Sequence, residues 1–399
     1  MTFAYEKHQL AQRDELLDAC DEIAPVLLDS VNQVEIDRHL SHDLVERLTS
    51  IGLYRLFVPQ SLGGLEVDVH TFICVIERLA QSNASAAWCT FISNTSTIIG
   101  AYLPDAEAKK IFCDSNIKMA GVFAPRGTAA RTVVDGVAGY RVSGSWMWGS
   151  ASYNADYITG GCLIVDEHGH PVKLPDGSFE NRTMVFSAEQ VSIADTWHTL
   201  GLRGTGSNEY GVKDVFVPAQ LSASIVSDVP LPGALFKFPV FCILGVGIAG
   251  VALGIARLAI NTLVELAMRK TPQGSARLLA DRTSTQQHVA RAEAKLRSAR
   301  AFLVEAVDRA WAASAESGHI HVDLRRDVRL ATTHATEEAV KVVTRMYSCA
   351  GGNAIFNGSD LQRALRDVMT ASQHMMISES TYELTGRLYL GVPTDTAML

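Results

Sequence analysis

One histidine near the C-terminal end of the chain has a type and position suited to proton chemistry. His374 closes the segment LQRALRDVMTASQH, which starts at Leu361 and carries the adjacent pair Arg366–Asp367 about two helical turns earlier. Because imidazole gains and loses a proton near neutral pH, it can donate to a reacting oxygen or take a proton from a substrate. A lone histidine on a helical face is more often a hydrogen-bonded structural residue. Its surroundings must therefore decide its role.

A second candidate combines a flat apolar ring with a hydroxyl. Trp148 and Ser150 follow one another closely in GYRVSGSWMWGSAS, an alternating, glycine-rich stretch typical of a strand and its turn. A flat redox cofactor needs such a ring and one hydrogen-bonding group at its reactive edge. The alternative is that Trp146 and Trp148 lie on one strand face as core packing, since strand side chains alternate with period two.

Metal and dinucleotide chemistry find little support in the spacing of residues. The seven cysteines include no C-x-x-C pair, and the close pairs His168–His170 and His319–His321 lack the helical spacing of a metal site. No G-x-G-x-x-G follows a strand and opens a helix, so a Rossmann nicotinamide site is not expected. We therefore predict no metal ligands, and reduced thiols in a cytoplasmic protein.

Composition and charge restrict the partners. With 399 residues, 47% hydrophobic and 20% charged, the chain is predicted to be globular and to hold more than one packed unit. A formal net charge of -8 without a basic cluster argues against nucleic acid and anionic membranes. The apolar run 238–256 could just span a membrane. However, a proline and four glycines interrupt it, so a buried interior helix is expected.

The periodicity of the chain changes twice. Residues 8–115 predict helices, with Ser41 as N-cap of one that stops at Gly52. Residues 119–218 alternate in short runs broken by turn residues, as strands do. Helical periodicity then returns from residue 239 to the end. The chain is therefore divided into helices at 1–117, a middle β unit at 118–228 and a helical bundle at 229–399.

This order resembles the acyl-CoA dehydrogenase fold over nearly the whole chain. Two segments are more specific: DTWHTLGLRGTGSNEYGVKDVFVP at 195–218 and LQRALRDVMTASQHMMISESTYELTGRLYLG from Leu361. Both resemble two-component (group D) flavin-dependent monooxygenases built on that fold. The resemblance implies a mainly α protein with a central β-barrel-like domain and a C-terminal four-helix bundle. Arg203, in the first segment, is not expected to be merely solvated.

The resemblance also implies flavin contacts in the β unit. Trp148 would pack its ring on the isoalloxazine and Ser150 would offer its hydroxyl at the flavin N5 edge. Phe123 and Thr128 fall where flavin or substrate contacts are expected. Ala151 stands where relatives usually have glycine, which restricts the backbone beside Ser150.

Three further residues are implied at the flavin of a neighbouring subunit. Gly351 and Gly352 resemble the glycine turn that meets the flavin pyrophosphate across the dehydrogenase tetramer, with Arg269 as a weaker candidate. A homotetramer is therefore expected. The same glycines are equally consistent with a helix C-cap followed by a loop.

The chain has no carboxylate at either position where the dehydrogenases keep their catalytic base. Counting from Arg366, the C-terminal base position falls on Met375, next to His374, and Tyr382–Glu383 lies too far along the chain. From Val229 to Val264, the first bundle helix has no Asp or Glu. Without a carboxylate an acyl-CoA α-proton is hard to remove.

A flavin oxygenase instead needs hydrogen-bonding groups around a protected oxygen adduct. His374 suits this need, either as a donor to the peroxide or as a base for a phenol-like substrate. Some relatives also place a histidine on the helix before the β unit, where this chain has Asn94. Substrate contacts are thus expected from Phe241, Met375 and Asn94.

The resulting prediction is the oxygenase component of a two-component monooxygenase. It takes reduced flavin (FADH2 or FMNH2) from a separate NAD(P)H–flavin reductase, reacts it with O2 to a C4a-hydroperoxyflavin, and hydroxylates a small aromatic or heteroaromatic substrate. The alternatives are an acyl-CoA dehydrogenase-type flavoenzyme with a displaced base, an N- or S-oxygenating relative, and a silent helical scaffold.

Overall fold

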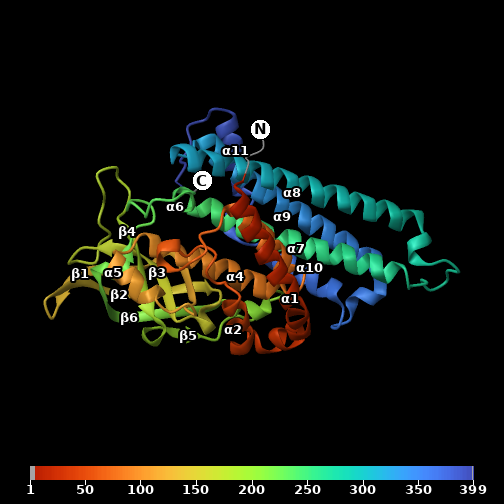
Figure 1. Ribbon diagram of the computed structural model, residues 1–399, viewed down its shortest axis with the longest axis horizontal. Coiled ribbons are helices and arrows are strands. Elements are labelled where there is room, and N and C mark those ends of the chain that lie inside the picture. The colour runs from red at the N-terminus through yellow and green to blue at the C-terminus, as the bar shows by residue number, and fades with distance from the viewer. Residues whose placement is uncertain (1–4, 398) are drawn as a thin grey trace.

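The chain is described from a computed structural model that covers residues 5–397 and 399, so the first four residues of the predicted N-terminal domain lie outside it (Figure 1). The N-terminal helices are α1 (Lys7–Asp37), α2 (His42–Ser50), α3 (Val69–Ala80), α4 (Ala84–Thr97) and α5 (Asp105–Phe112). The strands are β1 (Met119–Val134), β2 (Val137–Gly149), β3 (Tyr157–Val165), β4 (Asn181–Ser187), β5 (Ser192–Ala194), β6 (Asn208–Pro218) and β7 (Ser222–Ala223). The later helices are α6 (Ala234–Lys237), α7 (Val240–Ala267), α8 (Thr283–Ser317), α9 (Val322–Ala350), α10 (Asp360–Ala371) and α11 (Ser380–Tyr389). This is the predicted order of helices, strands and helices.

The strands form one seven-stranded sheet in the order β5-β6-β2-β1-β3-β4-β7. Only the β1–β3 pair is parallel, and the other neighbours run antiparallel. Within the described part of the chain the sheet is open, because its end strands β5 and β7 pair only with β6 and β4. The expected barrel-like closure is therefore not observed. The end strands are only three and two residues long, too short for a ladder between them.

Short polar side chains begin several of the N-terminal helices. Ser41 accepts the amide N–H of Leu44 at the start of α2, which confirms the predicted N-cap, and Gly52 follows that helix with a left-handed φ of 82°. Asp68 and Asn83 cap α3 and α4 in the same way. The start and direction of α4 matter most, because this helix carries Trp88.

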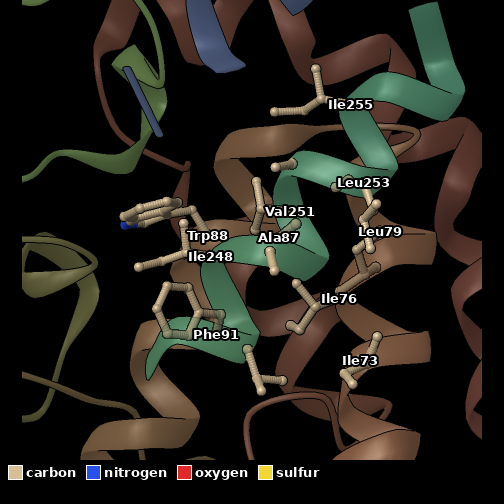
Figure 2. Close-up of a cluster of buried hydrophobic side chains, with 14 of the residues drawn as sticks. Ile73, Ile76, Leu79, Ala87, Trp88, Phe91, Ile248, Val251, Leu253 and Ile255 are labelled. Carbon is tan, nitrogen blue, oxygen red and sulfur yellow. The ribbon is translucent and has the colours of Figure 1, made fainter. Parts of the chain in front are cut away.

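Helix α7 is the apolar centre of the molecule. It is long and apolar enough to cross a membrane, but 83% of its most apolar window is buried inside the protein. Ile248 and Val251 of α7 pack against Trp88 and Phe91 of α4, and Figure 2 shows these side chains in one cluster. The predicted buried interior helix is confirmed. One apolar core joins the N-terminal helices to the C-terminal bundle through α7.

A charged network fastens α3 to α8 and gives a pH-dependent stability. His70 lies 3.0 Å from Asp308 through Nδ1, and Tyr5 donates its hydroxyl to the same carboxylate at 2.7 Å. Burial alone would lower the pKa of His70, but the interactions with Asp308 and Cys74 together outweigh it and raise this pKa to about 9. His70 therefore stabilises the fold fully below its ordinary pKa, near 6.5, and loses this contribution as pH rises through 9.

We expect the free energy of unfolding to fall by up to about 3 kcal/mol between pH 6.5 and 9 because of this histidine. Urea titrations at a series of pH values measure the loss. His70→Gln, which cannot become charged, should flatten the profile in this range. A His70→Gln profile as steep as that of the wild type would assign the pH dependence to other groups.

Candidate functional site

The Arg366–Asp367 pair on α10 holds three parts of the chain together. Arg366 makes two 2.8 Å hydrogen bonds to the carboxylate of Glu35 on α1, and a third to the carbonyl of Leu200 at 2.9 Å. Asp367 accepts the amide N–H of Leu202 at 2.6 Å. Burial raises the pKa of Asp367 to about 6, because the carboxylate loses its water. The pair thus anchors the loop that precedes β6.

Gly201 explains how that loop reaches α10. A Cβ at this position would stand 2.2 Å from the backbone carbonyl of Arg366, closer than atoms can approach. Only glycine lets the loop lie directly on the helix backbone. The next residue, Leu202, is buried and adopts a left-handed φ of 49°. The glycine of the GLRGTGS segment is therefore a contact residue rather than a plain turn former.

From this loop a chain of hydrogen bonds leads to Ser150. Trp88 Nε1 donates to Ser150 Oγ at 3.0 Å, Ser150 and Ser207 share a bond of 2.6 Å, and Ser207 and Thr205 share another of 2.6 Å. Thr205 then donates to the carbonyl of Leu202 at 2.8 Å. An indole N–H can only donate and a carbonyl can only accept. The direction is therefore fixed: Ser150 gives its proton to Ser207, and Ser207 gives its own to Thr205.

This direction leaves Ser150 with one free acceptor site. A hydroxyl oxygen has two lone pairs, and Trp88 occupies one of them. Ser150 is 4% exposed, so a second partner must approach it from the site and not from bulk water. The group can therefore receive one further N–H or O–H donor.

Two residues beside Ser150 adopt backbone conformations that favour glycine. Trp148 has φ 66° and Ala151 has φ 64°. Trp148 is 61% exposed, whereas Trp146 is fully buried and donates its Nε1–H to the carbonyl of Gly161. Trp146 therefore packs in the core, whereas Trp148 does not. Residues in strained backbone conformations concentrate at functional sites. Trp148 and Ala151 lie on either side of Ser150 in the sequence.

Ala151→Gly is expected to raise the free energy of unfolding by about 1 kcal/mol, because an L-residue in the left-handed region costs about 1–2 kcal/mol and glycine avoids that cost. Chemical denaturation measures the change. Ala124→Gly, at an exposed strand position with negative φ, should lower stability slightly instead. A destabilised Ala151→Gly protein would show that the alanine methyl group contributes packing that outweighs the strain.

His374 lies between α10 and the short 3-10 turn η9 (Met375–Ile377), close to Trp88. The ring centroids of Trp88 and His374 are 6.1 Å apart. Burial, with a smaller contribution from the positive charge of Arg329, lowers the pKa of His374 to about 4, so the imidazole is neutral at pH 7. Its Nδ1 accepts the amide N–H of Met376 at 3.2 Å. The single ring proton must therefore reside on Nε2.

The three predicted substrate residues have different surroundings. Met375 adjoins His374 and is 61% exposed, and Phe241 is half-buried in the first turn of α7. Asn94 is fully buried: it accepts the N–H of Phe57 and donates to the carbonyls of Leu53 and Thr90. Its amide thus holds the segment after α2 in place. The substrate role of Asn94 stays a prediction that this geometry does not favour.

Phe123 lies in an irregularity of β1, and Thr128 follows it. The pairing of β1 with β3 shifts register between Val122 and Gly127. Phe123 is half-buried within this shift and packs against the main core, whereas Thr128 is exposed after it and pairs with Ser143. Their roles in flavin or substrate contact stay predictions.

Arg269 and Gly352 line one open hollow of about 630 Å³ at the far end of α7, and Gly351, with φ 57°, adjoins it. Lys270 closes one side by donating to the carbonyl of Ala350 at 2.6 Å. At 1.5 Å per residue, the 28-residue helix α7 separates this hollow from Phe241 by about 40 Å. Trp88, which donates to Ser150, packs on Ile248 in the first third of the same helix, so the residues predicted for flavin binding form two groups separated by most of its length.

Sequence reasoning missed Trp88, and it treated Thr205 and Ser207 as turn residues only. Trp88 could have been noticed in the sequence, because it is the one large side chain in a run of small residues, ASAAWCT, and its indole carries an N–H donor. Arg203, which was singled out, has no ion pair among the residues that the structure describes, and its Nε is buried without a hydrogen-bond partner.

Comparison with known proteins agrees with this architecture. Residues 7–110 match the model of the acyl-CoA dehydrogenase N-terminal domain, and residues 246–379 match that of the C-terminal domain. Indole-3-acetate monooxygenase of Pseudomonas putida is 32% identical over 90% of both chains. The flavin-dependent monooxygenase oxygenase subunit HsaA of Mycobacterium tuberculosis is 29% identical over 98% of this chain and 99% of its own.

A solved structure shows the same arrangement. XiaF from Streptomyces sp., in complex with FADH2 and glycerol, superposes with a TM-score of 0.89 over 97% of both chains, at 27% identity. The match at 32% identity over 90% of both chains and the two domain models agree with one another. The chain therefore belongs to the flavin-dependent monooxygenases of the acyl-CoA dehydrogenase fold superfamily.

Proposed function

We propose that this protein is an oxygenase component that hydroxylates a small aromatic or heteroaromatic substrate with reduced flavin and O2. When bound, FADH2 or FMNH2 would supply two electrons and would carry the reacting oxygen as a C4a-hydroperoxyflavin. A separate NAD(P)H–flavin reductase would reduce it. The single observation that carries the proposal is that Trp88 lies close both to the neutral His374, whose proton is on Nε2, and to the open acceptor of Ser150.

The chain's own groups fit a reduced flavin. A reduced flavin has a hydrogen on N5, and Ser150 offers an acceptor without a proton to give, because its hydroxyl already donates to Ser207. The exposed Trp148 supplies a flat apolar surface next to it. Arg203 supplies a cation whose Nε has no partner. Ser150 would thus hold the N5 proton in place, while Trp148 holds the ring system.

His374 then acts as a hydrogen-bond donor and not as a base. Removing a substrate proton through Nε2 would require the ring proton to move to Nδ1, where it would face the N–H of Met376. Donation from Nε2 needs no such change and remains available above pH 4. We therefore propose that Nε2–H stabilises the oxygen that is transferred to the substrate.

Dehydrogenation finds no base in this geometry. Glu379 and Glu383, the first two carboxylates after Met375, are both exposed, and α7 has no acidic residue in its first turn. The similarity to an enzyme named for indole-3-acetate supports a heteroaromatic substrate over an acyl-CoA thioester. Phe241 and Met375 are the proposed apolar contacts of that ring.

The two separated groups of residues support an oligomer. A flavin dinucleotide is too short to bridge the about 30 Å of α7 between Ile248, which packs on Trp88 beside Ser150, and the hollow at Arg269. We propose that Arg269, Gly351 and Gly352 meet the flavin of a neighbouring subunit in a homotetramer, and that the enzyme is cytoplasmic.

One experiment tests the function. The anaerobic protein is mixed with FADH2 or FMNH2, oxygen is admitted, and the near-ultraviolet absorbance is followed with and without aromatic substrate. A long-lived absorbance band that decays faster with substrate and yields a hydroxylated product supports the proposal. Bleaching of oxidised flavin by an acyl-CoA would replace it with a dehydrogenase, and absence of flavin binding would refute it.

A further inference from the structure

Arg329 on α9 is a buried cation without a counter-ion. It is 3% exposed, and its guanidinium makes two long hydrogen bonds to neutral acceptors: the carbonyl of Phe241 at 3.3 Å and the hydroxyl of Thr381 at 3.4 Å. Its Nε has no partner. A buried charge without a partner is costly, so proteins keep one mainly where it serves a purpose.

The acidic residue nearest in sequence is already engaged elsewhere. Asp327 forms ion pairs with Arg326 and Arg309 and accepts the hydroxyl of Tyr389. Arg325 stands one turn before Arg329, and its Nε is also buried without a hydrogen-bond partner. Within residues 5–397 and 399, neither of these two arginines has a carboxylate in ion-pair distance. The two therefore form a cationic group on one face of α9.

The start of α7 adds to this positive character. Helix α7 begins after Pro239 with no side-chain cap and no acidic residue in its first turn, so its N–H groups and the positive end of its dipole lack an anionic partner. Arg329 contacts this turn through the carbonyl of Phe241. Gly245 lies beside it: a Cβ there would lie 3.4 Å from Arg329 Nη1 and only 2.9 Å from the hydroxyl of Thr332. An anion placed here would meet a guanidinium and a helix N-terminus together.

This group adjoins the proposed reaction site. Thr381 accepts from Arg329 and donates to the carbonyl of Met376, while the N–H of Met376 is bonded to His374 Nδ1. Phe241 and Met375, the proposed ring contacts, are neighbours of these same atoms. An aromatic ring held beside His374 would therefore bring a short acidic side chain towards Arg329.

We propose that Arg329, at the N-terminus of α7, binds the carboxylate of an aromatic-acid substrate, with Arg325 reinforcing the positive field. The proposal rests on the proposed function and narrows its substrate class from aromatic compounds to aromatic acids. A carboxylate would replace the two long neutral hydrogen bonds of Arg329 with charge-assisted ones.

The test compares an acid with its neutral twin. Equilibrium dialysis measures the affinity of the anaerobic protein, with and without FADH2, for indole-3-acetate and indole-3-acetamide, which differ only in the charged group. The wild type is expected to bind the acid about tenfold to a hundredfold more tightly. In Arg329→Met this preference should vanish, whereas Arg345→Met, at an exposed position of the same helix, should retain it.

Several outcomes separate this proposal from the one before it. Equal wild-type affinities for acid and amide, or an acid preference that survives in Arg329→Met, would overturn the carboxylate site and leave the oxygenase function intact. Absence of flavin binding would overturn the function, while dialysis without flavin would still decide the role of Arg329. If Arg329→Met does not fold, the wild-type comparison and Arg329→Lys, which keeps the charge and should keep part of the preference, decide instead.

Discussion

His374→Ala is expected to lower the hydroxylation rate by about a hundredfold to a thousandfold, while oxygen consumption continues and releases hydrogen peroxide. The reason is the loss of the single Nε2–H donor, since removing one preorganised donor to a developing oxygen anion costs this much in other enzymes. The measurement is the ratio of product formed to oxygen consumed, together with the lifetime of the near-ultraviolet absorbance.

Two further variants separate chemistry from structure at this position. His374→Asn can still accept the N–H of Met376, but it places no donor where Nε2 was, whereas His374→Gln reaches that place and loses the bond to Met376. We expect Asn to be as stable as the wild type yet uncoupled, and Gln to keep part of the coupling. His319→Ala, an exposed histidine, serves as control. A fully coupled Asn variant would reduce His374 to a structural cap.

The second large effect concerns the glycine that lies on α10. Gly201→Ala is expected to lower the free energy of unfolding by about 4 kcal/mol or more, because its Cβ would overlap the backbone of Arg366, which cannot move aside as a side chain could. The displaced loop would also release Leu202 from Asp367 and shift Thr205 and Ser207. Thermal unfolding and the dissociation constant for reduced flavin measure the two consequences.

Gly358→Ala provides the matched control, since nothing lies within 4 Å of a Cβ at that position and its φ is not left-handed. It should change stability by less than about 1 kcal/mol and leave flavin affinity unchanged. A Gly201→Ala protein with normal stability and normal flavin binding would contradict the contact between the loop and α10.

Much of the architecture was predictable from local patterns. The change from helical to alternating periodicity, the cap at Ser41 and the charge-free run of α7 each follow from the sequence within a few residues. Open sheet edges were not predictable, because strand pairing depends on partners far along the chain. The periodicity of the sequence therefore could not show whether the middle sheet closes into a barrel.

Site residues could be predicted where the family resemblance pointed to their positions. They were harder to predict where the role of a residue depends on whether its side chain is buried. Asn94 looked like a substrate residue because it replaces a histidine of relatives, yet three backbone groups occupy its amide. Arg329 escaped notice because arginine on a helix is usually solvated. Its spacing to Thr332 and Thr336, on the small-residue face of α9, was the available sign that it points inward.

Helix α10 has a consequence for how such an enzyme can diversify. Asp367, past the middle of this helix, fixes the loop that leads to Ser150, and the C-terminal end of the same helix leads into His374, so one rigid element helps to set the gap between the two. Phe241 and Met375 border that gap, and no side-chain hydrogen bond holds either of them. Mutation can therefore reshape the substrate side in small steps while the oxygen-handling side keeps its dimensions. Selection can then act on the two sides of the pocket separately.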